Sequence, residues 1–198
     1  MGFFNNREPK NCQEIYSAIN TRQVKALMFH DQMSDYFRFL GLDGFGWIHE
    51  YQHLSESMER RKLKQYYMLH HNRLLSDEEI DAVDIIPSGW YQYTRMDVTP
   101  QVRQQALQKA MSMYHDWEKE TKEFLEVCAA YLMAWKKMAD FSFIHCLIED
   151  VNDELECLDA MCIELEAVDY DPVYVMDMQR RCCKEYKEKC VKAKVKTD

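Results

Sequence analysis

One stretch of the sequence, residues 45–75, constrains the fold more than any other. It contains no proline and no glycine after Gly46, so nothing in it interrupts a helix of about eight turns at about 3.6 residues per turn. The whole chain of 198 residues has five glycines and four prolines, fewer than the many turns of a β-rich protein require. The sequence therefore predicts an all-α protein that forms one helical domain over residues 1–198.

The interior side of this predicted helix is unusually polar. Its apolar residues are Ile48, Tyr51, Met58, Leu63, Tyr66 and Leu69. At about 100° per residue, the polar residues on the same side are Gln52, Glu56, Glu59 and His70, with His49 on the flank. A helix that buries carboxylates and imidazoles is costly unless those groups have partners. The pattern therefore predicts a metal site, a buried hydrogen-bond network or a water-filled cavity.

Four further helices are predicted from apolar residues at helical spacing and from residues that begin and end helices. Gly41 ends the first helix, and the short link after it makes the first two helices antiparallel neighbours. Thr99 followed by Pro100, and Asp171 followed by Pro172, are favourable starts of later helices. The predicted helices cover residues 11–40, 45–75, 100–137, 139–167 and 172–190, followed by a basic tail, 191–198, that we expect to fray.

The segment 76–99 breaks every helical pattern and is too long for an ordinary turn. It holds the helix breakers Pro87 and Gly89 and a cluster of aromatic residues. We interpret it as a crossover that runs along the bundle between the second and third long helices, with the aromatic residues sealing it down. A functional lid is the alternative.

Composition excludes several classes of protein. The formal charge of −9 argues against a general nucleic-acid or anionic-membrane binder, because both need a basic surface. No run approaches the roughly 18 apolar residues of a transmembrane helix, and the first residues lack the apolar run of a secretory signal. We therefore expect a cytoplasmic protein. Its eight cysteines form no C-x-x-C pair, which favours reduced thiols over a disulfide framework or a zinc site.

The order of the predicted helices, with a short link, a long crossover and a second short link, resembles the ferritin-like superfamily. The resemblance covers nearly the whole chain in its layout. The motif that carries it is Glu56-x-x-Glu59, which lies where the second helix of ferritins has a Glu-x-x-His that binds iron. The sequence therefore departs from the ferritin motif at its second position.

A second resemblance lies at the start of the same helix. The phrase from Phe45 to Glu50 is similar to the one that opens this helix in the DNA-protecting mini-ferritins of bacteria. In those proteins the histidine that matches His49 binds iron together with an acidic residue four positions later and a histidine from the first helix. Here the acidic position is occupied by His53, and His30 is the available partner on the first helix.

These resemblances imply a ferritin-like metal-binding protein with a site inside the bundle, built from carboxylate and imidazole ligands of several helices. The candidate ligands are His30, Glu56, Glu59, Glu118 and Glu154, with His49 as an alternative ligand between subunits. A complete site would oxidise or store iron, in a ferroxidase-type reaction of Fe(II) with dioxygen or peroxide. Manganese and zinc remain open as alternative metals.

The alternative function is a metal-free ferritin-like bundle that acts as an interaction or oligomerisation module. It is favoured by Glu59 in place of the expected histidine, and by the position of Glu118 and Glu154 at the borders of apolar rows. In this interpretation Glu59 lies on a solvated ridge beside Arg60 and Arg61. A homo-oligomer is expected under both functions.

Overall fold

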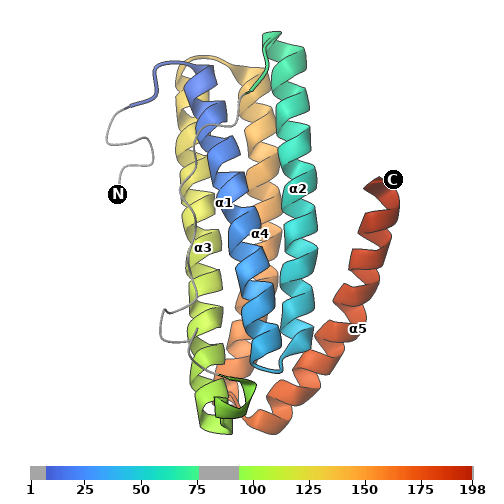
Figure 1. Cartoon of the computed structure of the whole chain (residues 1–198). Coiled ribbons are helices and arrows are strands. Elements are labelled where there is room, and N and C mark those ends of the chain that lie inside the picture. The colour runs from blue at the N-terminus through green and yellow to red at the C-terminus, as the bar shows by residue number, and fades with distance from the viewer. Residues whose placement is uncertain (1–7, 76–93, 198) are drawn as a thin grey trace.

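The computed structural model describes residues 8–75 and 94–197, and these residues form helices joined by short turns. The long helices are α1 (Cys12–Phe39), α2 (Asp43–His71), α3 (Pro100–Ala134), α4 (Met138–Ala167) and α5 (Pro172–Thr197), and a short 3-10 helix, η2 (Arg95–Asp97), precedes α3 (Figure 1). No strand occurs among the described residues. None of the described helices is sufficiently long and apolar to span a membrane. The predicted all-α fold is confirmed.

The first four long helices form an up-down-down-up bundle. α1 and α2 are antiparallel neighbours, α3 and α4 are a second antiparallel pair, and α2 and α3 run in the same direction (Figure 1). α2 therefore ends at one end of the bundle, and α3 begins at the other. Most of the predicted crossover, including the aromatic residues Trp90, Tyr91 and Tyr93, lies in residues 76–93, outside the described part of the chain.

The helix starts follow from local side-chain chemistry. Asn11 accepts a hydrogen bond at its side-chain Oδ1 from the Glu14 N–H (3.0 Å), and the Thr99 Oγ1 accepts one from the Val102 N–H (3.2 Å). Such caps satisfy N–H groups that have no partner within a helix. Between α1 and α2, Gly41 has a φ of +73°, a conformation that glycine adopts without steric cost.

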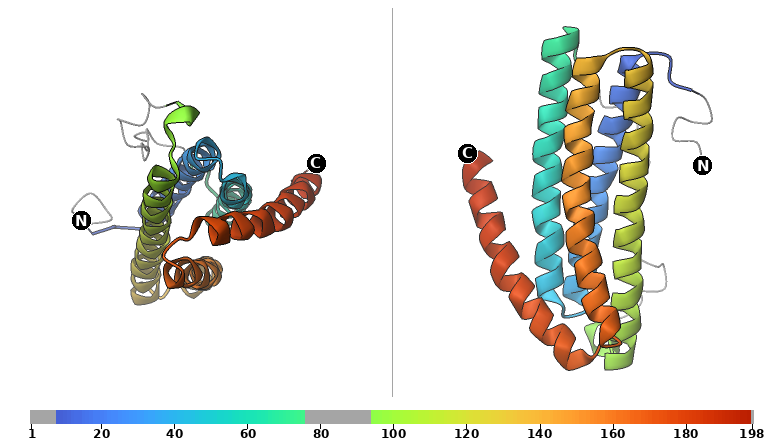
Figure 2. Two further views of the ribbon diagram at one scale, coloured as in Figure 1. Left: turned by 90° about the horizontal axis from the view of Figure 1, so that it is seen from below. Right: turned by 180° about the vertical axis from the view of Figure 1, so that it is seen from behind.

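Helix α5 leaves the bundle at the α1–α2 turn and packs against α2 (Figure 2). At Gly44 the two backbones approach so closely that a Cβ atom would lie 1.8 Å from the Gln179 carbonyl oxygen. α5 continues to Thr197, beyond the helix end predicted at residue 190. The reason is that the tail has an apolar side, since Cys190 and Ala193 are 1 % and 7 % exposed.

The interior consists of two separate apolar clusters, one toward each end of the bundle. The cluster nearer the α1–α2 turn includes Phe37, Phe45 and Leu107, and the cluster at the opposite end includes Ile15, Leu63 and Ile144. α2 joins both, because Ile48 and Leu63 are buried as predicted. The predicted buried residue Leu69 is 75 % exposed, because it lies about 200° around the helix from the buried Tyr67.

Candidate metal centre

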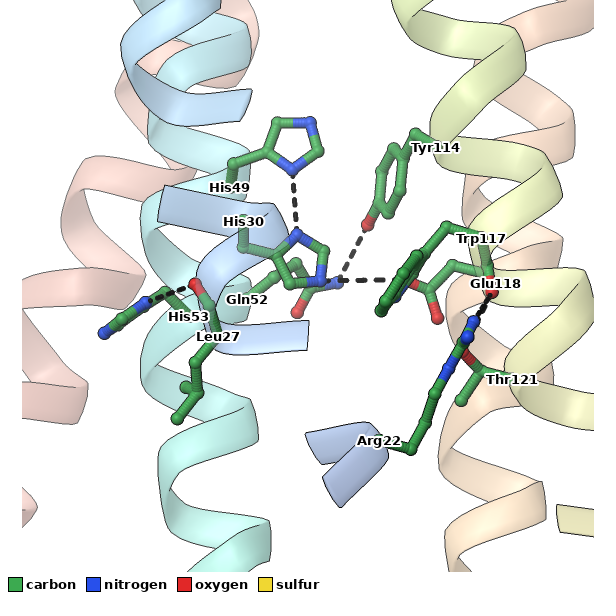
Figure 3. A network of polar contacts seen from close by, with 10 residues as sticks. All are labelled: Arg22, Leu27, His30, His49, Gln52, His53, Tyr114, Trp117, Glu118 and Thr121. Atoms are coloured by element: carbon green, nitrogen blue, oxygen red, sulfur yellow. Dashed lines mark hydrogen bonds and ion pairs between the residues drawn. The ribbon is translucent and has the colours of Figure 1, made fainter. Parts of the chain in front are cut away.

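A layer of polar side chains lies between the two apolar clusters, and three of the bundle helices contribute its buried residues. α1 supplies His30, α2 supplies Gln52, and α3 supplies Tyr114 and Glu118 (Figure 3). His30 is 0 % exposed and Glu118 is 1 % exposed. Both are candidate ligands predicted from the sequence, and they face each other across the α1–α3 contact.

His30 and Glu118 lie close together without forming a hydrogen bond. The His30 Nε2 is 3.6 Å from the Glu118 Oε1, which is longer than an N–H···O hydrogen bond. Among the described residues, neither this nitrogen nor either carboxylate oxygen of Glu118 has a hydrogen-bond partner. A buried polar group without a partner costs about 1–3 kcal/mol, and more if it is charged. The pair therefore has unused capacity to bind a ligand in the protein interior.

His49 supports His30 from the other side of its ring. The two Nδ1 atoms are 2.9 Å apart, so one imidazole donates and the other accepts. Burial, and then the neighbouring His30, hold the pKa of His49 well below its usual value. His49 stacks on Phe37 at 5.3 Å between ring centres. It is 1 % exposed, so a ligand role between subunits does not fit its position in the interior.

Three further glutamates lie within electrostatic reach of this pair. Burial, and then Glu59, Glu118 and Glu154, raise the pKa of Glu56 well above its usual value. Burial and the nearby Asp150 raise the pKa of Glu59 to about 7. Burial, and then Glu118 and Glu59, raise the pKa of Glu154 in the same direction. Since each carboxylate destabilises the charge of its neighbours, the four glutamates form one cluster that favours cations or protons.

A fixed positive charge also borders the cluster. The Arg22 guanidinium lies 3.7 Å from the centre of the Trp117 ring and donates to the Trp117 carbonyl oxygen (2.8 Å) and the Thr121 Oγ1 (Figure 3). Its charge lowers the pKa of Glu56, although burial outweighs this effect. Arg22 therefore neutralises part of the carboxylate charge. The sequence alone did not indicate this role, because the partners of Arg22 lie on another helix.

The glutamate cluster opens into a groove between α2, α4 and α5, which encloses a cavity of about 320 Å³. Glu59 and Glu154 line this groove, together with Gln52 and Tyr114. The Gln52 Nε2 donates to the Tyr114 hydroxyl (3.2 Å), whereas the Gln52 Oε1 is buried without a described partner. The site is thus a buried histidine–glutamate pair that is joined to the surface by further carboxylates.

The structure brings most of the predicted ligands into one region, but does not assemble them into a closed metal cage. His30 and Glu118 are in direct proximity, and the other predicted glutamates are linked to Glu118 by their mutual electrostatic effects. Within residues 8–75 and 94–197, no three histidine, cysteine or acidic side chains stand close enough to hold a metal ion. His53, at the acidic position of the mini-ferritin motif, bonds instead to the Leu27 carbonyl oxygen (3.1 Å).

Comparison with solved structures identifies the fold. The chain is similar to an open-pore ferritin of the hyperthermophilic archaeon Archaeoglobus fulgidus, with a TM-score of 0.69, 17 % sequence identity, and coverage of 86 % of this chain and 93 % of that one. It is also similar to a form of the Archaeoglobus fulgidus ferritin engineered to be closed, with a TM-score of 0.70, 16 % identity, and coverage of 89 % and 97 %. No family model and no curated protein matches the sequence. The fold is ferritin-like.

Proposed function

We propose that this chain, with a ferritin-like bundle as its frame, binds a divalent metal cation in the polar layer between its two apolar clusters. One observation carries the proposal: the His30 Nε2 and the carboxylate oxygens of Glu118 are buried, have no hydrogen-bond partner among the described residues, and are separated by 3.6 Å between Nε2 and Oε1. Ligand atoms of one cation with bonds of about 2.1 Å are separated by roughly 3.4 Å in tetrahedral geometry. The donor pair therefore fits a cation better than it fits a hydrogen bond.

The finer proposal is that the cation is iron, bound for oxidation or storage. Carboxylate and imidazole donors suit Fe(II), and they also suit manganese and zinc. Glu56, Glu59 and Glu154 supply the negative charge that a divalent ion needs, and their raised pKa values mean that a cation displaces protons when it binds. Bound Fe(II) would supply electrons to dioxygen or peroxide, which is a ferroxidase-type reaction.

Metal analysis and titration test this proposal. Protein purified without chelator is analysed for iron, manganese and zinc, and the metal-free protein is then titrated with Fe(II) under anaerobic conditions. We expect at least one cation per chain in the wild type, and loss of binding in Glu118→Gln and in the double variant Glu56→Gln/Glu59→Gln. Glu123→Gln, an exposed glutamate on the same helix as Glu118, is the matched control and should bind normally. Metal-free wild type that takes up no Fe(II) would contradict the proposal.

The alternative function is a metal-free interaction module, and Arg22 is the observation that favours it. Its charge is fixed beside Glu56 and Glu118, so an internal cation already offsets part of the carboxylate repulsion. Under this alternative, Arg22→Gln would destabilise the protein by leaving the glutamates unopposed. Under the metal-binding proposal, the same variant would bind Fe(II) more tightly, because a competing positive charge is removed. Affinity measured for this variant separates the two functions.

The remaining expectations concern the assembly and compartment of the protein. We propose that it forms a homo-oligomer, which is supported by large apolar side chains on its surface, including Leu69 (75 % exposed), Leu74 (84 %) and Val173 (79 %). A cytoplasmic location stays a prediction from composition. Light scattering coupled to gel filtration measures the assembly directly, and a monomer at micromolar concentration would contradict it.

A further inference from the structure

The groove between α2, α4 and α5 connects solvent with the glutamate cluster. The residues that line it become less exposed from the surface inward. Asp150 and Asp153 on α4 are exposed, Glu59 and Glu154 are half-buried, and Gln52 at the inner end is 7 % exposed. Carboxylate and amide oxygens therefore line the groove from its opening to its inner end. Beyond them lie Glu118 and His30, which have no exposed surface to speak of.

Two observations show that this lining is linked to the buried site. Gln52 and Tyr114 line the groove, and both lie beside His30 and Glu118 in the polar layer (Figure 3). Independently, the Oε1 of Gln52, a residue that lines the groove, is a buried acceptor without a described hydrogen-bond partner. Such an acceptor is costly unless a donor or a cation reaches it.

We propose that this groove is the path by which a divalent cation reaches His30 and Glu118, and that Asp150 and Asp153 form its first binding site. The inference rests on the proposed metal-binding function and adds the route and the outer residues. Glu59, Glu154 and Gln52 then provide oxygen ligands along the path, so that a cation loses its water molecules stepwise rather than at once. Oxygen donors of this kind suit hard divalent cations.

Two lysines reduce the negative charge of the groove. Lys62 of α2 and Lys189 of α5 also line the groove, so they offset half of the charge of its four carboxylates. Direct contact with the aspartates, rather than the remaining net charge, holds a cation at the outer site.

The rate of Co²⁺ uptake tests the route. Metal-free protein is mixed with Co²⁺ in a stopped-flow instrument, and quenching of tryptophan fluorescence reports arrival at the site, since Trp117 packs on Arg22 beside the cluster. We expect Asp150→Asn/Asp153→Asn to slow uptake by about five- to tenfold, the effect of losing direct contacts with a divalent ion in a wet site. Affinity and stoichiometry at the inner site should stay within about twofold of the wild type.

A matched control separates the groove from the general charge of α4. Glu149→Gln/Glu156→Gln removes the same charge from exposed positions of α4 that do not line the groove, and it should bind Co²⁺ at the wild-type rate. Equal slowing in both double variants would overturn the route. Wild-type protein that binds no Co²⁺ would overturn the proposed function, whereas normal binding with an unchanged rate in the aspartate variant would overturn only the route.

A steric block gives a second, independent test. Cys157 is exposed and lines the groove, so a bulky maleimide attached to its thiol should obstruct the path. Uptake of Co²⁺ should slow at least tenfold in labelled wild type and stay fast in labelled Cys157→Ser, which keeps the other cysteines. Fast uptake in fully labelled wild type would overturn the route.

Discussion

Asp140 and Glu118 are the carboxylates with almost no exposed surface in the part of the chain that the structure describes, and their surroundings differ. Asp140 lies near the start of α4 and is 6 % exposed. Its Oδ1 accepts hydrogen bonds from the Tyr16 hydroxyl (2.8 Å) and lies 2.8 Å from the His71 Nε2. Glu118 lies in the middle of α3, is 1 % exposed, and has no described hydrogen-bond partner at either oxygen. One carboxylate is satisfied by the protein, and the other is not.

The difference follows from where each carboxylate lies on its helix. Asp140 is in the first turn of α4, where the helix dipole favours a negative charge. Tyr16 and Tyr67 pack on the ring of His71, which holds the donors in place. Glu118 has no helix terminus nearby, and its neighbours include other carboxylates. Asp140 therefore stabilises the fold, whereas Glu118 is buried without the hydrogen bonds that would compensate for its loss of solvent.

Removing Asp140 should have the largest effect on stability. Asp140→Ala leaves the Tyr16 hydroxyl and the His71 ring without their shared acceptor, and loss of a buried, bonded carboxylate costs about 3–5 kcal/mol. Denaturant-induced unfolding of the metal-free protein measures this change. Asp153→Ala, an exposed aspartate on the same helix, is the control and should change the free energy of unfolding by less than about 0.5 kcal/mol. A loss of less than about 1 kcal/mol for Asp140→Ala would contradict the conclusion that Asp140 stabilises the fold.

Removing the carboxylate of Glu118 should raise the free energy of unfolding, whereas removing Asp140 lowers it. Glu118→Met replaces an unpartnered buried carboxylate with an apolar chain of similar length, so the metal-free protein should gain about 1–2 kcal/mol in its free energy of unfolding. The same variant should lose the extra stability that Fe(II) or Co²⁺ gives to the wild type. Melting temperatures with and without cation measure both effects. Destabilisation of the metal-free variant would show that Glu118 has a structural partner after all.

The raised pKa of Glu59 should make the stability of the protein depend on pH. The pKa of Glu59 is raised to about 7 in the folded state, so the folded protein holds more protons than the unfolded chain between about pH 4.5 and pH 7. Its free energy of unfolding should therefore fall as the pH rises through this window, by about 1–2 kcal/mol from this group. Glu59→Gln should remove that part of the slope. His49 has the opposite pKa shift, but it contributes equally to both proteins and cancels in the difference.

Sequence reasoning found Glu118 but not the surroundings of Asp140, and the reason is physical. Helical spacing determines which side chains share a face of a helix. The polar side of α2, and the place of Glu118 at the edge of the apolar row of α3, could therefore be predicted from each helix alone. The Tyr16–Asp140 hydrogen bond joins residues 124 positions apart, and the Arg22–Trp117 contact likewise joins two helices. Such pairs depend on how the helices are rotated and how far they are shifted along one another, which periodicity does not give. The order of the helices was predictable because short links fix it.

The smallest effect is expected for Tyr16→Phe, which tests whether the Asp140 cluster is redundant. The variant removes one hydrogen bond and keeps the ring, so the packing against Tyr67 at 5.0 Å between ring centres persists. Because His71 still lies beside the carboxylate, the loss should be about 1 kcal/mol, typical of one neutral donor removed from a shared acceptor. Cation binding should be unchanged, since the polar layer lies elsewhere in the bundle. If Tyr16→Phe destabilised the protein as much as Asp140→Ala, the stabilising effect of Asp140 would depend on the Tyr16 hydrogen bond alone. The contrast between Asp140 and Glu118 would then rest on that one bond. Unfolding curves of the two variants measured side by side decide between these outcomes.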